Sequence, residues 1–226
     1  MPAESPLRDG HAARFELIET LRFDPAEGFV RGERHLARLA GSARALGFAF
    51  DAAAAWRAME AAVVPERMQR VRLTLAPDGT LACTAAAFAP SPGPFTLAIA
   101  ATRLASSDPL LGHKTSRRGV YERARAEFAA DAVDEVLLLN ERDEVCEGTF
   151  TNVFLPLPAE ERLATPRLSC GLLPGILRGE LIAAGKAFEA LLTVDDLAAC
   201  DRLFVGNSLR GLVEARLAPG SVPLGR

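Results

Sequence analysis

Residues 145–154 have the sequence VCEGTFTNVF, in which Glu147 and Asn152 stand within an otherwise apolar, strand-like run. A glutamate that is half-buried in such a strand needs a partner, because an unpaired buried carboxylate is costly. A salt bridge with an arginine elsewhere in the chain would satisfy it, and so would a functional site that carries a positive group. The strand by itself favours neither interpretation.

Lys114 ends the segment Gly112-His113-Lys114, directly before a helix predicted at 116–130. On position alone, such a lysine is usually exposed to solvent. In a cleft between two lobes, however, burial would make its amine lose the proton more easily. The neutral amine would then be a nucleophile toward an aldehyde.

Two further segments have features of anion sites. Arg34 and Arg38 are four positions apart, so they share one face of the helix predicted at 33–46. The sequence LLPGILR at 172–178 places proline and glycine at the start of another predicted helix, where free backbone N–H groups attract anions. Surface arginines and helix starts of this kind are common, so each signal is weak alone.

The composition restricts the functional classes. The 26 basic and 29 acidic residues are interleaved and give a formal net charge of -3, which leaves no basic surface for nucleic acid or an anionic membrane. The apolar runs are too short to cross a bilayer, and the first ten residues lack the layout of a signal peptide. The cysteines form no CxxC pair and have no ligand-like spacing with the histidines. We therefore expect a soluble, cytoplasmic protein without a metal site.

Two common enzyme classes lack their motifs in this chain. There is no GxGxxG or GxxxxGK[ST] segment for a dinucleotide or nucleotide phosphate, and no GxSxG segment for a serine hydrolase. The three histidines have no serine partner that the sequence makes obvious.

Hydrophobic periodicity and turn residues predict an α/β (α+β) protein of two small lobes. The first lobe is predicted to span 1–104 and the second 113–226, with the turn-forming segment ASSDPLLG at 105–112 as the linker. Strands are predicted at 15–23, 69–76, 81–88, 95–101, 135–140, 145–155 and 202–206, and helices at 33–46, 51–64, 116–130, 174–187 and 195–199.

Five segments, in their order along the chain, resemble the class IV aminotransferase family of pyridoxal-phosphate enzymes. That family includes 4-amino-4-deoxychorismate lyase, branched-chain aminotransferase and D-amino-acid aminotransferase, and the resemblance implies the two-lobed fold type IV. It extends from about 15 to 213. The segments are HLARL at 35–39, HK at 113–114, EGTFTNVF at 147–154, LLPGILR at 172–178 and GNSLRG at 206–211.

The resemblance implies a role for each matching residue. Lys114 would hold the cofactor as a Schiff base and move the substrate proton, and Glu147 would keep the pyridine nitrogen protonated. Asn152 would orient the strand after Glu147. The cofactor phosphate would be bound by Arg38, by the backbone N–H groups of Ile176 and Leu177, and by Asn207 and Ser208.

Within the family, several features favour the lyase. Arg118 stands four positions after the lysine, and Gly119 stands where branched-chain aminotransferases tend to carry tyrosine. The GNSLRG segment resembles the asparagine-containing loop of the lyase. Thr20 is a candidate hydroxyl relay near the substrate. Candidates for binding substrate carboxylates are Arg72, Arg118 and Arg210. Arg70 lies on the same strand face as Arg72, so either of these two could serve.

Three hypotheses follow for the activity. The first is a lyase of folate biosynthesis that releases 4-aminobenzoate and pyruvate from 4-amino-4-deoxychorismate. The second is an aminotransferase for a branched-chain or D-amino acid. The third is a non-catalytic paralogue, because the first hairpin of the family is missing or replaced here and Leu177 stands where several relatives have threonine. The resemblance also implies a homodimer.

Overall fold

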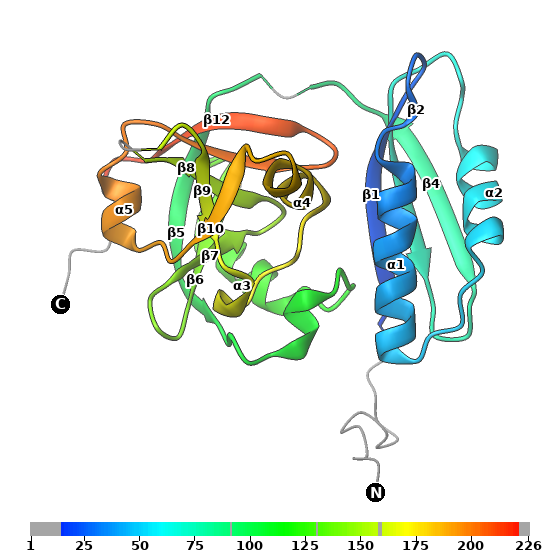
Figure 1. Cartoon of the computed structure of the whole chain (residues 1–226), viewed down its shortest axis with the longest axis horizontal. Helices are drawn as coiled ribbons and strands as arrows, with labels where there is room; N and C mark the ends of the chain where they lie inside the picture. Colours follow the sequence, from blue (N-terminus) through cyan, green and yellow to red (C-terminus); the bar gives the residue numbers. More distant parts are fainter. Residues whose placement is uncertain (1–14, 91, 130, 158–159, 222–226) are drawn as a thin grey trace, which may run out of the picture.

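The computed structural model describes residues 15–90, 92–129, 131–157 and 160–221. The prediction about the first hairpin of the family concerns the N-terminal end, and residues 1–14 lie outside this part. The described chain forms two lobes that lie side by side, each built on its own β-sheet (Figure 1). The two-lobed α/β prediction is confirmed.

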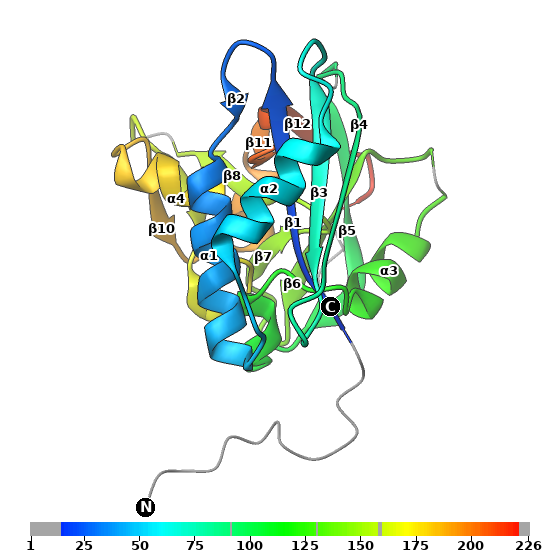
Figure 2. The same ribbon diagram turned by 90° about the vertical axis from the view of Figure 1, so that its right-hand side faces the viewer.

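The first lobe carries a four-stranded sheet with the strand order β2-β1-β3-β4. Its helices α1 and α2 cover one face of that sheet (Figure 2). The opposite face carries Thr20, Arg70 and Arg72. The elements are β1 (Leu17–Asp24), β2 (Gly28–Phe29), α1 (Gly32–Leu46), α2 (Ala52–Ala62), β3 (Gln69–Leu75) and β4 (Leu81–Ala87).

Local sequence explains both helices of this lobe. The buried residues Leu36, Leu39 and Ala43 recur at helical spacing in α1 and pack against β1. Gly47 ends α1 with a left-handed φ of 74°, a conformation that glycine adopts without a steric penalty. The Asp51 carboxylate caps α2 by accepting backbone N–H groups of its first turn.

The second lobe carries an eight-stranded sheet with the strand order β10-β9-β8-β11-β12-β5-β6-β7, in which both faces are covered by apolar clusters. Its strands are β5 (Phe95–Leu104), β6 (Glu135–Asn140), β7 (Val145–Gly148), β8 (Asn152–Pro156), β9 (Leu163–Pro166), β10 (Ala187–Ala190), β11 (Leu203–Asn207) and β12 (Gly211–Leu217). Its helices are η1 (Pro109–Gly112), α3 (Gly119–Ala126), η2 (Leu168–Cys170), α4 (Ile176–Ala183) and α5 (Val194–Ala198).

The predicted linker at 105–112 is in the wrong place. Strand β5 lies between β12 and β6 in the second sheet, so the chain changes lobes between the end of β4 at Ala87 and the start of β5 at Phe95. Segment 105–112 instead contains η1, which leads to Lys114 inside the second lobe. The apolar run at 95–101 predicted a strand, but such a run does not reveal the sheet to which a strand belongs.

Backbone hydrogen bonds join the two lobes at the lysine. The Ile18 N–H donates to the Lys114 carbonyl at 2.8 Å, and the Ser116 N–H donates to the Glu16 carbonyl at 2.8 Å. The segment that carries Lys114 is therefore paired with the beginning of β1. This pairing fixes the lysine between the sheets.

A tight turn divides the predicted strand at 145–155 into β7 and β8. The buried Glu135 carboxylate holds this turn. It accepts hydrogen bonds from the Val136 N–H at 2.9 Å, the Thr149 N–H at 3.0 Å and hydroxyl at 2.5 Å, the Phe150 N–H at 3.1 Å, and the Thr151 hydroxyl at 2.8 Å. One carboxylate thus satisfies five donors and fixes the turn that follows Glu147.

Replacing Glu135 with alanine should lower the free energy of unfolding by about 3 kcal/mol, because several buried donors would lose their acceptor. Urea denaturation measures the change. The matched control is Glu160→Ala, which removes an exposed ion pair with Arg162 and should cost less than about 0.5 kcal/mol. Equal losses in the two variants would contradict the role given to Glu135.

Candidate active site

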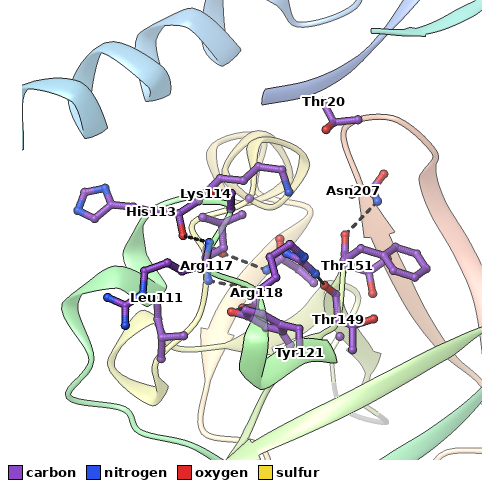
Figure 3. A pocket seen from close by; sticks show the side chains of 18 of the residues that line it. Thr20, Leu111, His113, Lys114, Arg117, Arg118, Tyr121, Thr149, Thr151 and Asn207 are labelled. Carbon is purple, nitrogen blue, oxygen red and sulfur yellow. Dashed lines mark hydrogen bonds between the residues drawn. The ribbon is translucent and has the colours of Figure 1, made fainter. Parts of the chain in front are cut away.

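A pocket of about 760 Å³ lies between the lobes, and Lys114 and Glu147 are both among its lining residues. The first lobe contributes Thr20, His35, Arg38 and Arg70 from β1, α1 and β3 to this lining. Figure 3 shows the Lys114 side chain extending between Thr20 on one side and Arg118 and Tyr121 on the other. The structure therefore brings most of the predicted site residues together.

The Lys114 amine has the properties of a nucleophile. Burial, together with the nearby positive charges of Arg38 and Arg118, lowers its pKa to about 8, although the Glu19 and Glu147 carboxylates partly oppose this. A larger fraction of this amine is therefore neutral near pH 7 than for a lysine in water. A neutral amine in an enclosed pocket can attack a carbonyl and can accept a proton.

Glu147 is buried on the wall of the same pocket. Its Oε1 accepts a hydrogen bond from the Tyr121 hydroxyl at 2.7 Å, and its Oε2 accepts one from the Leu173 N–H at 3.2 Å. Burial raises its pKa to about 7, while these hydrogen bonds and the charge of Lys114 act in the opposite direction. Glu147 can thus share a proton with a basic nitrogen that is placed against it.

Arg118 has a supporting position in addition to its place in the lining of the pocket. Its guanidinium donates to the Thr149 carbonyl and lies 4.7 Å from the centre of the Tyr121 ring. Because Tyr121 in turn contacts Glu147, Arg118 fixes the wall on which Glu147 lies. The sequence identified Arg118 as a substrate ligand, and no sequence signal pointed to its contact with Tyr121.

The start of α4 forms one end of the pocket. Ile176, the first residue of α4, lines the pocket, whereas the Leu177 side chain is buried outside this lining. The Asn152 amide donates to the Leu173 carbonyl at 3.1 Å, which agrees with a positioning role for Asn152. A Cβ atom at Gly175 would lie 1.9 Å from Asn152 Oδ1, so only glycine fits before this helix start.

Asn207, the last residue of β11, and Ser208, which follows it, both line the pocket. The Asn207 amide donates to the Phe150 carbonyl at 3.1 Å, and its Oδ1 accepts the N–H groups of Leu209 and Arg210. Figure 3 shows the hydrogen bond from Asn207 to the loop after β7. These bonds hold the loop that presents Ser208.

His35 has a serine partner that the sequence did not reveal. Its Nε2 lies 2.7 Å from Ser208 Oγ, and its Nδ1 lies 2.6 Å from Glu19 Oε2. Glu19 also accepts two hydrogen bonds from Arg38, at 2.9 Å and 2.6 Å. Ser208 is 173 positions from His35, and no spacing rule connects residues so far apart.

The substrate-binding prediction needs one correction. Arg70 lines the pocket, whereas Arg72, two residues further along β3, does not. Of the two arginines on this strand face, Arg70 is therefore the one placed to reach a ligand in the pocket. Arg210 lines the pocket as predicted, and its guanidinium lies 5.2 Å from the centre of the exposed Phe150 ring.

Within the described ranges there is no group of three or more histidine, cysteine, aspartate or glutamate side chains suited to a metal ion. None of the helices described is both long and apolar enough to span a bilayer.

The residues of the pocket fit pyridoxal phosphate. Lys114 provides a reactive amine, and Glu147 provides a buried carboxyl for the ring nitrogen. The α4 start and Ser208 provide donors for a phosphate. The missing Cβ atom at Gly175 leaves room for the Asn152 side chain beside the α4 start, and the free backbone N–H groups of a helix start attract an anion.

Comparisons with known proteins place the chain among such enzymes. Residues 16–218 match the sequence profile of the family described as amino-transferase class IV. A Mesorhizobium loti protein of known crystal structure, provisionally assigned as an amino-acid aminotransferase, is 50% identical in sequence to this chain. The match covers 90% of this chain and 100% of that protein's chain, with a TM-score of 0.87.

Two further relatives differ in activity. The 4-amino-4-deoxychorismate lyase of Pseudomonas aeruginosa is 26% identical with a TM-score of 0.74, covering 93% of this chain and 86% of its own. A Thermotoga maritima protein, assigned without proof as a branched-chain-amino-acid aminotransferase, is 37% identical over 87 residues. That match covers 36% of this chain and only 31% of the relative's length.

The pKa of Lys114 predicts its reaction with an acylating reagent such as acetic anhydride. The chain has only one other lysine, the exposed Lys186, which serves as an internal comparison. In cofactor-free protein, acylation of Lys114 should reach half of its maximal rate near pH 8, whereas a lysine in water ionises near pH 10.4. Peptide mass spectrometry across pH 6–11 measures both rates. Identical pH profiles for the two lysines would contradict this assignment.

Proposed function

We propose that this chain, which belongs to the class IV family of aminotransferases, is a lyase that converts 4-amino-4-deoxychorismate to 4-aminobenzoate and pyruvate. Enzymes of this family depend on pyridoxal phosphate. The family resemblance further supports a homodimer, and the four free cysteines support a cytoplasmic location. The arginine content of the pocket is the observation that carries the choice of substrate.

Bound pyridoxal phosphate supplies an electron-withdrawing ring that stabilises negative charge at the carbon from which a proton leaves. The residues of the chain would bind the cofactor, orient it and move the proton. Lys114 would hold the cofactor through its amine, and the same amine would take and return the proton at the substrate carbon. Its pKa of about 8 suits this exchange near neutral pH.

Glu147 would hold a proton between its carboxyl and the ring nitrogen of the cofactor. Its pKa of about 7 leaves the proton shared, and Tyr121 fixes the carboxylate by donating to Oε1. At the other end, the α4 start, Ser208 and Arg38 would hold the phosphate. The chain thus offers partners for both ends of the cofactor, with the Lys114 amine between them.

The remaining wall of the pocket is strongly cationic. Six arginines line the pocket, against three acidic residues, Asp108, Glu122 and Glu147. The phosphate requires only part of this positive charge. A substrate with two carboxylates, such as 4-amino-4-deoxychorismate, would use the rest, whereas a branched aliphatic side chain would need an apolar wall. The six arginines are Arg38, Arg70, Arg117, Arg118, Arg123 and Arg210.

An aminotransferase is the second candidate, and the 50% identity to the Mesorhizobium loti protein favours it. The same lysine and carboxyl would serve, because both reactions begin with removal of a proton beside the substrate amine. With this pocket the amino donor would be an acidic amino acid rather than a branched-chain one.

Product analysis separates the two candidates. Incubation of the purified protein and pyridoxal phosphate with 4-amino-4-deoxychorismate should release 4-aminobenzoate and pyruvate in equal amounts, measured by chromatography. The Lys114→Ala variant should release neither, because the proton acceptor is removed. Amino-acid-dependent conversion of a keto acid, without 4-aminobenzoate, would reject the lyase and support the second candidate.

The arginine pair on β3 tests how the substrate binds. Arg70→Ala should raise the KM roughly 10-fold or more, the cost of one charge-assisted hydrogen bond, with a smaller effect on kcat. Arg72→Ala is the matched control two residues away and should leave both values within roughly twofold, because Arg72 lies outside the pocket. A reversed ranking of the two variants in steady-state kinetics would contradict the corrected assignment.

A further inference from the structure

Three polar side chains stand in series on the wall of the pocket that carries Glu147. Arg118 directly precedes α3, Tyr121 lies in the first turn of α3, and Glu147 lies on β7. All three line the pocket. Figure 3 shows Arg118 beside the Tyr121 ring, with its hydrogen bond to the Thr149 carbonyl. The series therefore connects a helix to a strand at the point where a ligand would meet Glu147.

Each oxygen of Glu147 accepts one hydrogen bond from the protein. The Tyr121 hydroxyl donates to Oε1 at 2.7 Å, and the Leu173 N–H donates to Oε2 at 3.2 Å. A carboxylate has roughly four acceptor positions, so lone pairs on both oxygens remain for a ligand. Both donors stabilise the ionised carboxylate relative to the neutral acid. They also fix the orientation of the carboxyl group toward the pocket.

Arg118 strengthens the hydrogen bond from Tyr121. Its guanidinium carbon lies 4.7 Å from the centre of the Tyr121 ring, within the range of a cation–π contact. Burial and the Glu147 carboxylate raise the pKa of the phenol, whereas the charge of Arg118 acts in the opposite direction. The hydroxyl therefore keeps its proton near pH 7, and the nearby cation polarises it into a stronger donor.

These donors affect where a proton shared with a ligand lies. A ring nitrogen against Glu147 can carry the proton and face a carboxylate, or it can be neutral and face a carboxylic acid. The two arrangements have the same number of protons and the same net charge. Burial favours the neutral pair, whereas hydrogen bonds to the carboxylate and the charge of Arg118 favour the ionised pair.

We propose that Arg118 and Tyr121 are positioning residues that keep Glu147 an ionised hydrogen-bond acceptor, so that the shared proton lies on the ring nitrogen of pyridoxal phosphate. The inference rests on the proposed function, because the ring is that of the cofactor. A protonated ring nitrogen withdraws electrons more strongly than a neutral one. The two residues thus act through Glu147 on the electronic state of the ring.

The alternative is that Arg118 and Tyr121 only pack α3 against β7. A pair of ligands distinguishes the two roles. In one analogue of pyridoxal phosphate the ring nitrogen is replaced by a C–H group, so that the analogue cannot share a proton with Glu147. A packing role would affect both compounds equally, because both need the same pocket shape. The proposed role affects only the compound that has the ring nitrogen.

The first test measures the affinity of cofactor-free protein for each compound from the absorption band that forms at Lys114. Tyr121→Phe should weaken pyridoxal phosphate roughly fivefold or more and the analogue less than roughly twofold. Arg118→Leu should change the ratio of the two affinities in the same direction. After burial and Arg38, Arg118 also lowers the pKa of Lys114, but this effect cancels in the ratio because both compounds react with the same amine.

The second test observes the proton directly. Nitrogen-15 NMR of labelled pyridoxal phosphate should show a protonated ring nitrogen in the wild-type protein. In Tyr121→Phe the signal should move toward that of a neutral pyridine. Arg125→Ala is the matched control on the same helix, because the Arg125 Nη2 donates to the Val133 carbonyl at 2.7 Å. It loosens α3 without removing a contact with Glu147, so the affinity ratio should stay within roughly twofold of the wild-type value.

The outcomes separate the inference from the proposed function. Equal weakening of both compounds in Tyr121→Phe, an unchanged ratio, or a neutral ring nitrogen in the wild-type protein overturns the inference and leaves the proposed cofactor intact. A wild-type protein that forms no band with either compound overturns the proposed function and the inference with it. Should Arg118→Leu fail to fold, Tyr121→Phe alone decides, because it removes a single oxygen atom.

Discussion

The pairing of the Lys114 segment with β1 is the contact on which the rest of the site depends. The Ile18 N–H and the Lys114 carbonyl join the two lobes beside an isolated bridge between Leu17 and Thr115. Among the residues that the structure describes, no named strand of one sheet pairs with a named strand of the other. This hydrogen bond places the lysine between the sheets, where burial and neighbouring arginines lower its pKa to about 8. The reactivity of the amine is thus a result of tertiary structure rather than of its local sequence.

Two buried glutamates in this small site have opposite protonation behaviour. Burial raises the pKa of Glu147 to about 7, because its partners are a phenol and one backbone N–H. Glu19 is equally buried, yet the two hydrogen bonds from Arg38 and the contact with His35 hold its pKa at about 2. One carboxyl can therefore exchange a proton with a ligand, while the other is a permanent charge that orients its neighbours.

Local patterns predicted the helices and most strands, because caps, turns and periodicity are encoded within a few residues. The Asp51 cap and the glycine that ends α1 are examples. Long-range partners were not predictable in the same way. The sheet to which β5 belongs, the choice of Arg70 over Arg72, and the contact between His35 and Ser208 all depend on residues distant in sequence. The ordered motifs located Lys114 and Glu147 but not the residues behind them.

The chain passes between the lobes only once in the part that the structure describes, between Ala87 and Phe95 (Figure 1). Everything else that keeps the pocket closed is noncovalent, and a molecule that touches both lobes adds to it. A ligand that contacts both lobes should therefore stabilise them against coming apart. This stabilisation should grow as the free ligand concentration rises above the dissociation constant. The pocket that binds the ligand is thus also the place where the two lobes are held together.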